Sequence, residues 1–336
     1  MIREAIAAVV VGRDLTEAEA AATMEEIMSG DATPSQMGAL LIGLRIKGEN
    51  VDEITGMVRV MREKALRLDI EGDVLDVVST GGGSFDPFNI STAAALICAG
   101  AGVRVAKHGN RGFTSTSGAA DVLEGLGAKL ELEPDGVKRC IEKSGFGFLF
   151  AQLFHPAMRF VGPTRREVGV RTVFNSLGPL TNPAGAQFQL IGAGEAALQE
   201  KVAQVLARLG TGKALVVHSE DGLDEVSLGA PTHVLEVTGH DLRSYILAPE
   251  DAGFARIPLS EVKTGTAAEN AALMREIFDG RKCPQRDYAL INAGLALTTV
   301  GRAKHVRDGV SLAAEAIDSG AAKRALDAYV AASQEA

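Results

Sequence analysis

Apolar side chains near the start of the chain recur three and four positions apart, the spacing of one face of an α-helix. The clearest case lies between residues 33 and 48, where the apolar positions include Met37, Leu40, Leu41 and Leu44. A side chain at each of these positions faces the same way on a helix, so the segment predicts an amphipathic helix with one buried face.

Helix start signals precede these apolar stretches. Thr16 with Glu19 and Thr33 with Gln36 have the three-residue spacing of a capping box, in which each side chain bonds the other residue's backbone N–H. A further helix is expected to begin near Asn50. We therefore predict that residues 1–70 form a small all-helical domain.

From residue 74 the pattern changes to short apolar runs, each followed by a glycine-containing loop and a helix-like stretch. This order is typical of strand, loop and helix units around a mostly parallel sheet. The predicted strands are 74–78, 103–106, 146–150, 189–191 and 214–218. The predicted helices include 90–100, 118–126, 165–174 and 196–209, and residues 178–185 are expected to be a loop.

The predicted fold class is thus α/β, with two domains. A small helical domain, residues 1–70, precedes a larger α/β domain, residues 71–336, whose mostly parallel central sheet is flanked by helices. A helical segment near 165–185 is expected to join the helical domain.

Composition narrows the function classes. The formal net charge is -9 and aromatic residues make up 4% with no Trp, which disfavours nucleic acid as a partner because phosphate backbones are bound by clustered Lys and Arg. No apolar run reaches the length of a membrane span and no export signal is evident. The three cysteines, Cys98, Cys140 and Cys283, lack disulfide-framework or zinc spacing, so a reducing cytoplasm is expected.

The loop after the first predicted strand, residues 79–84, contains three consecutive glycines and leads to Asn89 and a helix start. Glycines let backbone N–H groups approach an anion closely, and a helix N-terminus adds donors and positive potential. The loop predicts a phosphate cradle, although a plain flexible turn with a helix cap fits the glycines equally well. It matches neither the dinucleotide-binding pattern nor the P-loop.

The loop after the second predicted strand, residues 107–111, reads Lys-His-Gly-Asn-Arg and is followed by several hydroxyl side chains. Its two cationic side chains supply charge for phosphates, and its glycine permits close approach. The alternative is a solvated basic turn with a histidine that caps the core.

Two further pairs of charged residues are candidates. Asp224 and Glu225 follow the strand ending near residue 218 and suit Mg²⁺, a hard cation that keeps waters and bridges to substrate phosphates; taken alone, such a pair is more often solvated surface. Arg165 and Arg166 offer a bidentate carboxylate clamp or, equally, a surface pair on a helix. No histidine spacing suits zinc, and no serine nucleophile elbow is present.

Taken in order, these segments resemble the anthranilate phosphoribosyltransferase family, in the nucleoside phosphorylase-like glycosyltransferase group. The matching segments are 80–82, 88–92, 107–111, 117–118, 120–124, 155–158, 165–167, 173–175, 177–180, 182–183, 222–228 and 292–294. The resemblance implies transfer of the phosphoribosyl group of phosphoribosyl pyrophosphate to the amine of anthranilate. The products would be N-(5-phosphoribosyl)anthranilate and pyrophosphate, in tryptophan biosynthesis, with Mg²⁺ as cofactor. It also implies a homodimer joined through the helical domain.

The resemblance assigns roles to residues of this chain. Lys107 and His108 would be catalytic, Lys107 by neutralising the leaving pyrophosphate and His108 as an orienting donor rather than a base. Phosphoribosyl pyrophosphate would be bound by Ser79, Gly81, Gly82, Gly83, Asn89, Ile90, Ser91, Thr92, Lys107, Gly109, Asn110, Arg111 and Ser115. Anthranilate would be bound by Ser79, Asn110, Arg165 and Gly178, with its carboxylate on Arg165, and the metal by Ser91, Asp224 and Glu225.

The chain departs from the family's usual pattern in the substrate loops. Ser79 and Ser84 stand where glycine is usual, Gly83 replaces an aspartate and Pro87 a threonine, with Thr116 for lysine and Ala119 for serine nearby. Such changes bear on affinity and on the choice of acceptor.

Three alternatives stay open at this point. One is a related glycosyltransferase with a different acceptor. Another is a pyrimidine nucleoside phosphorylase, a group that carries a similar Ser-Thr-Gly-Gly run, although Val77 replaces its preceding lysine. The third is a non-enzymatic paralogue that binds nucleic acid or a regulatory ligand, which retention of Lys107, Asp224 and Glu225 disfavours.

Overall fold

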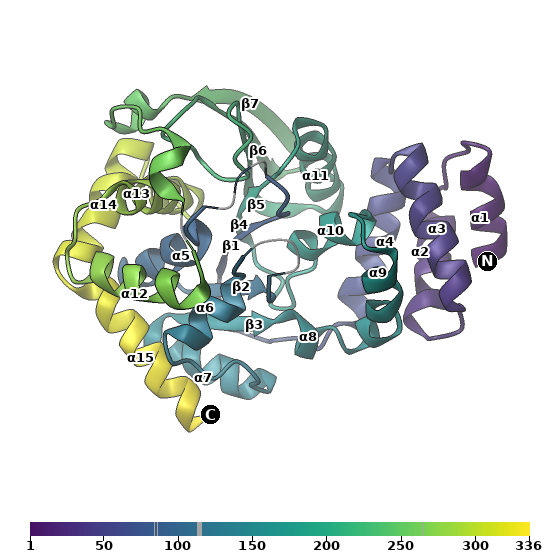
Figure 1. The fold of residues 1–336 in the computed structure, drawn as a ribbon, viewed down its shortest axis with the longest axis horizontal. Coiled ribbons are helices and arrows are strands. Elements are labelled where there is room, and N and C mark those ends of the chain that lie inside the picture. Colours follow the sequence, from purple (N-terminus) through teal and green to yellow (C-terminus); the bar gives the residue numbers. More distant parts are fainter. Residues whose placement is uncertain (84, 86, 113–115, 264) are drawn as a thin grey trace.

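Four helices form the start of the chain in the computed structural model, which describes residues 1–83, 85, 87–112, 116–263 and 265–336. They are α1 (Ile2–Val10), α2 (Glu17–Met28), α3 (Pro34–Lys47) and α4 (Val51–Lys64), the bundle at the right of Figure 1. The capping boxes predicted at Thr16 and Thr33 are both present, and Asn50 caps α4 in the same way with Glu53. The helix starts are therefore fixed by local side-chain bonds that the sequence predicts.

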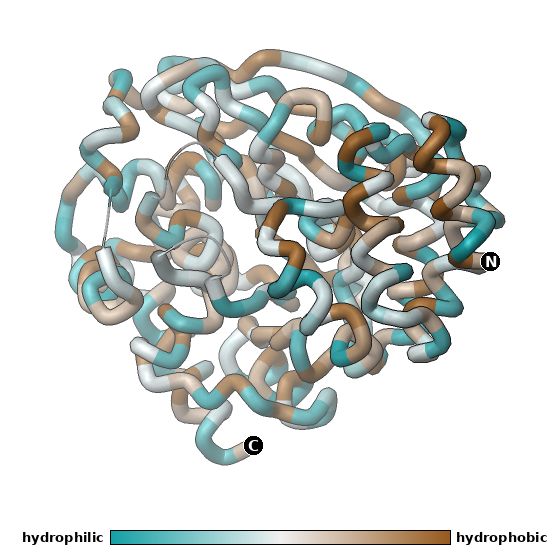
Figure 2. Tube along the Cα trace, turned by 45° about the vertical axis from the view of Figure 1, so that its right-hand side comes forward, coloured by the Kyte–Doolittle hydropathy of each residue, from teal (hydrophilic) through white to brown (hydrophobic). Residues whose placement is uncertain are grey.

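The interior of the bundle contains one buried carboxylate. Glu53 accepts hydrogen bonds from the backbone N–H groups of Leu15 and Asn50, both at 2.9 Å, and from Lys47 Nζ at 3.0 Å. The bond to Leu15 ties the entry of α2 to the first turn of α4. Hydrophobic and hydrophilic stretches follow one another along the helices of the bundle, as Figure 2 shows.

A seven-stranded sheet in the order β3-β2-β1-β4-β5-β6-β7 runs through the described part of the larger unit. Its parallel strands are β1 (Leu75–Ser79), β2 (Val105–Gly109), β3 (Phe146–Phe150), β4 (Phe188–Gly192) and β5 (Thr211–Ser219). All five overlap the predicted strands. The predicted fold class, a helical domain and an α/β domain with a mostly parallel sheet, is confirmed.

The sequence analysis missed the antiparallel hairpin at one edge. Strands β6 (Thr232–Gly239) and β7 (Asp241–Leu247) pair with β5 and with each other through a tight turn at Gly239 and His240. Most of β7 is exposed, and it therefore lacks the apolar alternation of a half-buried strand. Gly239 adopts φ +61°, the left-handed conformation that such a turn requires.

Helices cover both faces of the sheet (Figure 1). They are α5 (Ile90–Gly100), α6 (Ala119–Gly125), α7 (Pro134–Ser144), α8 (Ala151–Phe154), α11 (Ala196–Leu209), α12 (Ala267–Phe278), α13 (Pro284–Thr299), α14 (Val306–Asp318) and α15 (Ala321–Glu335). Alternate residues of the central strands enter two separate cores. Leu215 and Val217 of β5 pack with α5 and α13, whereas Ala214 and Val216 pack with α11 and the bundle. This period of two is the pleat of a sheet buried on both faces.

The segment predicted as one helix over 165–174 is two short helices, so that prediction is wrong in part. Helix α9 (Gly162–Val168) ends at Gly169, whose φ of +68° stops the helix, and α10 (Val173–Leu177) begins after an extended stretch. The expected loop at 178–185 begins with a 3₁₀ turn, η2 (Gly178–Leu180). Further 3₁₀ turns are η1 (Pro156–Phe160), η3 (Pro249–Ala252) and η4 (Leu259–Val262).

The segment around α9 and α10 lies against the bundle. Helix α9 contacts α3, and α10 contacts both α3 and α4. Phe174 of α10 belongs to the same cluster of buried side chains as the bundle interior and as Leu206 of α11. Because that cluster crosses the expected boundary, the division of the chain near residue 70 stays a prediction. Within the described residues, no helix is both long and apolar enough to cross a membrane.

Candidate active site

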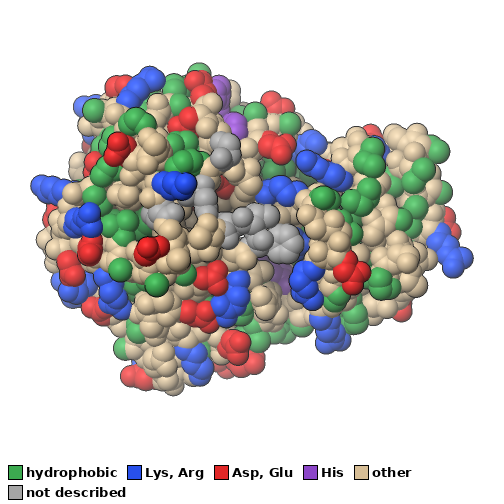
Figure 3. All heavy atoms as spheres, viewed as in Figure 1, with side chains coloured by type: hydrophobic (Ala, Val, Ile, Leu, Met, Phe, Trp, Pro, Cys, Tyr) green, Lys and Arg blue, Asp and Glu red, His purple; other side chains and the backbone are tan. Residues whose placement is uncertain are grey.

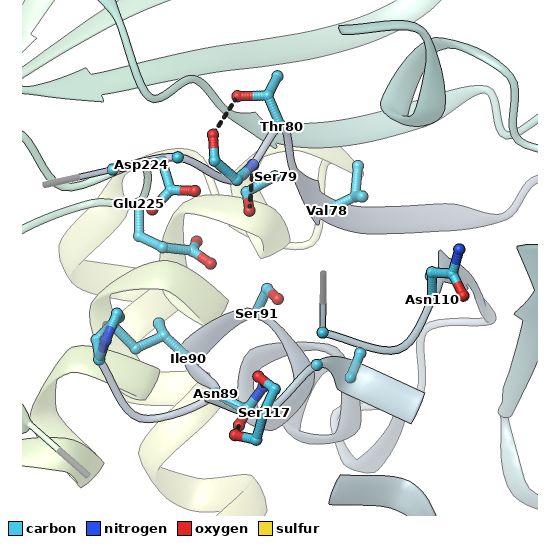
Figure 4. Close-up of a pocket in the computed structure, with 18 of the residues that line it drawn as sticks. Val78, Ser79, Thr80, Asn89, Ile90, Ser91, Asn110, Ser117, Asp224 and Glu225 are labelled. Atoms are coloured by element: carbon cyan, nitrogen blue, oxygen red, sulfur yellow. Dashed lines mark hydrogen bonds between the residues drawn. The ribbon is translucent and has the colours of Figure 1, made fainter. Parts of the chain in front are cut away.

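A cavity of about 610 Å³ opens at the carboxyl ends of β1 and β2, where ligands bind in sheets of this kind. The glycine loop after β1, the start of α5, the end of β2 and the loop after β5 enclose it (Figure 4). Lys and Arg side chains gather on the neighbouring surface, at the junction between the α/β body and the bundle (Figure 3). The residues predicted for the site that line it are Ser79, Gly81, Gly82, Gly83, Asn89, Ile90, Ser91, Lys107, His108, Gly109, Asn110, Arg111, Asp224 and Glu225.

Three predicted site residues do not line the cavity, and the position of a fourth is not described. Thr92, Arg165 and Gly178 are not among the described residues that line the cavity, and Ser115 lies outside the described residues. The carbonyl of Gly178 still touches the site, because it accepts a hydrogen bond from His108. Arg165 lies on α9 with its guanidinium carbon 5.3 Å from the centre of the Phe174 ring.

The glycine loop has a backbone that needs glycine. Gly81 and Gly82 have φ values of +64° and +83°, in the left-handed region. Arg171, in the extended stretch between α9 and α10, donates from Nη2 to the carbonyls of Gly81 at 2.9 Å and Thr80 at 3.2 Å. An arginine thus binds the carbonyl groups of the loop, a contact that the sequence analysis did not foresee.

The N-terminus of α5 faces the cavity without a cap from its own N-cap residue, Asn89. The Asn89 side chain is instead held by Ser117, whose Oγ donates to Asn89 Oδ1 at 3.1 Å. Asn270 on α12 completes this network by donating from Nδ2 to Ser117 Oγ and by accepting from the Asn89 backbone, both at 3.2 Å. The arrangement orients the positive end of the α5 dipole toward the cavity.

Asp224 and Glu225 are buried carboxylates opposite that helix start, as Figure 4 shows. Burial, reinforced by the Asp224 charge, raises the pKa of Glu225 to about 8, although Lys107 and two hydrogen bonds from Ser91 oppose the shift. Burial also raises the pKa of Asp224, against a hydrogen bond from the Ser79 hydroxyl. The oxygens of Ser91, Asp224 and Glu225 therefore form a hard-donor set in which a divalent cation would relieve the carboxylate repulsion.

The number of acidic ligands is small. Among the described residues, no three His, Cys, Asp or Glu side chains come together to hold a metal ion. A cation at this pair would complete its coordination with the Ser91 hydroxyl, with water and with oxygens of a bound phosphate, as Mg²⁺ does at phosphate-transfer sites.

Lys107 is 1% exposed, and its Nζ donates to Ser91 Oγ at 3.2 Å and to the Val77 carbonyl. Burial lowers the pKa of this ammonium, while the charges of Asp76 and Glu225 raise it. A buried cation beside the carboxylate pair suits a ligand that carries both phosphate and metal.

Burial, with His155 as a second cause, lowers the pKa of His108 to about 3, so this ring is neutral. Its Nδ1 donates to the Gly178 carbonyl at 3.1 Å, because a carbonyl oxygen only accepts. Nε2 then carries no proton and only accepts. Nε2 is buried and has no hydrogen-bond partner among the described residues, so the role of His108 as an orienting donor stays a prediction.

Arg111 is already paired with acidic residues. Its guanidinium bonds Glu124 and, at 3.2 Å, Asp121, both on α6. These partners raise the pKa of Arg111 and neutralise most of its charge. The alternative prediction for residues 107–111 was a solvated basic turn. Arg111 fits that alternative, whereas Lys107 lies in the cavity.

Two departures from the family's usual sequence both lie against Asp224. The Ser79 hydroxyl donates to the Asp224 carboxylate, and a Cβ on Gly83 would lie 2.8 Å from Asp224 Oδ1. A side chain at position 83 would collide with this carboxylate, while Ser79 adds a bond to it. The two changes together let the acidic loop approach the glycine loop closely.

The residues that sequence reasoning missed come from segments that follow no predicted strand. Arg171 and Asn175 line the cavity from the α9–α10 segment, and Asn270 supports it from α12. Asp76, inside β1, reads as a lone polar residue in an apolar run. Only the polar character of Asp76 within a buried strand signalled that it needs a partner.

The fold and the site define the class of the protein. Residues 71–323 match the family model described as the glycosyl transferase family a/b domain, and residues 3–65 match the glycosyl transferase family helical bundle domain. This chain is thus a glycosyl transferase of the two-domain type, with a helical bundle before an α/β domain.

Individual relatives narrow the class. The chain is 54% identical over 335 residues to an anthranilate phosphoribosyltransferase of Chloroflexus aggregans, covering 99% of this chain and 98% of that one. The crystal structure of anthranilate phosphoribosyltransferase from Thermus thermophilus superposes with a TM-score of 0.92 at 44% identity, over 98% of this chain and 99% of that one. The Saccharomyces cerevisiae enzyme in complex with PRPP and Mg superposes with the same TM-score at 25% identity, over 100% and 98%. The chain belongs to the anthranilate phosphoribosyltransferase family.

Cation binding at the acidic pair is expected to depend on pH. A proton on Glu225 competes with the cation between the ordinary pKa of 4.5 and the raised value of about 8. Displacing one proton changes the apparent affinity by about tenfold per pH unit below the raised pKa. We expect Mn²⁺ binding in the presence of pyrophosphate, followed by electron paramagnetic resonance, to strengthen from pH 6 to pH 8.

The matched variant is Glu225→Gln, which has no proton to lose at this position. Its weaker Mn²⁺ binding should show a shallower pH dependence than that of the wild type. Identical slopes for the two proteins would place the competing proton on another group.

Proposed function

We propose that this chain transfers the phosphoribosyl group of phosphoribosyl pyrophosphate to the amine of anthranilate, forming N-(5-phosphoribosyl)anthranilate and pyrophosphate in tryptophan biosynthesis. The observation that carries the proposal is the convergence in one cavity of the α5 N-terminus, Lys107 and the buried carboxylates Asp224 and Glu225. We also infer a cytoplasmic location, in which the free thiols of Cys98, Cys140 and Cys283 stay reduced.

The donor is expected to bind with its phosphates along the glycine loop and the start of α5. Backbone N–H groups of Gly81 to Gly83 and the side chains of Asn89 and Ser91 supply hydrogen bonds, and the helix dipole adds favourable potential. Thr92, also predicted to bind the donor, is buried behind this lining. The hard-donor set of Ser91, Asp224 and Glu225 would hold Mg²⁺, which supplies positive charge to the departing pyrophosphate when bound. The remaining donor contacts predicted from the sequence, Ser79, Ile90, Lys107, Gly109, Asn110, Arg111 and Ser115, are part of the same proposal.

The reaction replaces a C–O bond at ribose C1 with a C–N bond. The C1–O bond breaks with oxocarbenium character at the sugar, and the electron pair leaves with pyrophosphate, whose growing charge Lys107 stabilises. The neutral aromatic amine attacks C1 and then loses a proton, so no strong base is needed, and holding the amine near C1 supplies much of the acceleration. The predicted contribution of His108 would be one of position, because its Nδ1 is held by the Gly178 carbonyl and its Nε2 is buried.

Anthranilate is proposed to lie between Ser79, Asn110 and Gly178, with its carboxylate on Arg165. Arg165 lies outside the cavity lining in this structure, so this contact requires α9 to approach the cavity when the acceptor binds. Arg165 is half-buried beside Phe174, and burial lowers the pKa of its guanidinium. A partly desolvated arginine binds a carboxylate more strongly than an exposed one.

The direct test is a turnover assay with purified protein. Mixing it with phosphoribosyl pyrophosphate, Mg²⁺ and anthranilate should cause a progressive loss of anthranilate fluorescence as the amine is alkylated, with one pyrophosphate released per anthranilate consumed. Chelation of the metal should stop the reaction. Release of pyrophosphate with a different amine, and none with anthranilate, would sink the proposed acceptor while leaving the reaction class in place.

Replacement of Arg165 tests the binding of anthranilate independently of the binding of the donor. We expect Arg165→Ala to raise KM for anthranilate by about 10- to 100-fold, the loss expected for a charge-assisted hydrogen bond, and to change KM for the donor by less than about twofold. The exposed neighbour Arg166 provides the matched control, since Arg166→Ala removes the same charge from the same helix. Equal losses for both substrates in Arg165→Ala would contradict the carboxylate contact.

We further propose a homodimer joined through the helical domain, residues 1–70. The ends of α1 and α3 expose large apolar side chains, with Val10 at 69%, Val11 at 79% and Ile46 at 82% of their surface. A second copy would cover them, because isolated exposed apolar side chains of this size gain stability from burial. Sedimentation should give twice the mass of one chain, and Ile46→Glu should shift the protein toward monomer; a monomeric wild type would overturn the proposal.

A further inference from the structure

Strands β1 and β2 separate after their first residue pair. The three other parallel neighbours in the sheet each pair five residues, as β1 does with β4. Between β1 and β2, whose residues are all described, only Leu75 pairs with Val105. The opening lies at the carboxyl end of the strands, directly beneath the cavity.

Side chains take over the hydrogen bonds that the ladder would have made. Asp76 Oδ1 accepts from the His108 backbone N–H at 3.1 Å, and Asp76 Oδ2 accepts from Asn182 Nδ2 at 2.7 Å. The same Asn182 amide donates to the Ala106 carbonyl at 2.8 Å. A carboxylate and an amide therefore satisfy both backbone groups of β2 that the separation leaves unpaired.

The β1 side of the opening is satisfied by Lys107. Its Nζ donates to the Val77 carbonyl and continues to Ser91 Oγ, 3.2 Å away at the start of α5. The lysine chain thus lies in the space between the strands, which brings a residue from within the sheet to the cavity lining. A continuous ladder between β1 and β2 would occupy that space with backbone hydrogen bonds.

The opening contains a buried pair of opposite charges. Asp76 is 0% and Lys107 is 1% exposed. Burial raises the pKa of Asp76 to about 6 and lowers the pKa of Lys107, and the charge of each residue opposes the shift of the other. Two buried groups of opposite charge rarely add stability compared with apolar packing of the same volume. The separation also removes backbone hydrogen bonds between β1 and β2. A gain in folding stability therefore does not explain why Asp76 and Lys107 are buried there.

We propose that Asp76, held by Asn182, is a positioning residue for the transfer reaction: it keeps β1 and β2 apart and fixes the Lys107 ammonium at the edge of the cavity. Asp76 does not line the cavity and acts through Lys107. This inference rests on the proposed function, because it assigns Asp76 to the same site and the same leaving group.

The test combines a double-mutant cycle with a neighbouring control. Asp76→Asn keeps the shape and one oxygen for the His108 N–H but removes the charge, and Lys107→Met removes the ammonium at similar length. Gln189→Met on β4 is the control, because Gln189 is also a buried amide that binds the 178–183 segment, at Pro179, without touching Lys107.

Asp76→Asn should lower kcat by about 10- to 100-fold relative to Gln189→Met, since a misplaced charged group costs that much. In the Lys107→Met background, Asp76→Asn should lower kcat by less than about threefold, because the ammonium that Asp76 positions is absent. The melting temperature should fall in Asp76→Asn and recover in the double variant, which buries no unpaired charge. A purely structural role would lower kcat by the same factor in both backgrounds.

Unchanged kcat in Asp76→Asn, or equal factors with and without Lys107, would overturn the proposal. If Asp76→Asn yields no folded protein, Asn182→Ala tests the same point, with a kcat below that of Gln189→Met expected and an equal kcat overturning it. Binding of phosphoribosyl pyrophosphate, measured by calorimetry, distinguishes a failure of the proposed function from a failure of the role of Asp76. A wild type that binds the donor without turnover defeats the proposed function. In that case weaker donor binding in Asp76→Asn than in Gln189→Met supports the role of Asp76, and equal binding defeats it.

Discussion

Opposite charges buried around one cavity are the constraint on which the rest of this structure depends. Asp224, Glu225 and Lys107 are all buried, and an isolated charge is costly away from water. Each of these groups is therefore stable only beside its partners. Ser91 at the start of α5 accepts from Lys107 and donates to Glu225, and the Ser79 hydroxyl donates to Asp224, so hydrogen bonds hold these groups in place. Positions fixed before the substrate arrives are what electrostatic catalysis requires, because no reorganisation is then needed during the reaction.

Local signals in the sequence were sufficient for most of the fold. The capping boxes of the bundle depend on residues three positions apart, and the central strands are short, mostly apolar runs followed by glycine-containing loops, so both could be recognised without knowledge of tertiary contacts. The hairpin of β6 and β7 could not, because β7 is mostly exposed and its pairing is set by β6 rather than by its own pattern. Gly169, which is visible in the sequence, ends the helix predicted over 165–174.

The site residues that come directly after a predicted strand could be located from the sequence. Lys107 and the glycine loop could be located because the carboxyl ends of parallel strands meet at one edge. Arg171 and Asn270 could not, because they reach the cavity from α9–α10 and α12, whose places around the sheet no local pattern encodes. The state of His108 was also beyond the sequence, since its proton is placed by the Gly178 carbonyl, 70 residues away.

Arg171 connects the α9–α10 segment, which packs on the bundle, to the glycine loop after β1. The stretch that contains it lies between α9 and α10, both packed on the bundle, while its guanidinium bonds the carbonyls of Thr80 and Gly81. A displacement of α9 that brings Arg165 to an acceptor would therefore pull on the same loop that we propose to bind the donor's phosphates. Occupancy of one half of the cavity then changes the free energy of filling the other, and by thermodynamic reciprocity the two ligands influence each other equally. Cooperation between two substrates thus follows from one side chain that bonds the backbone of a distant loop.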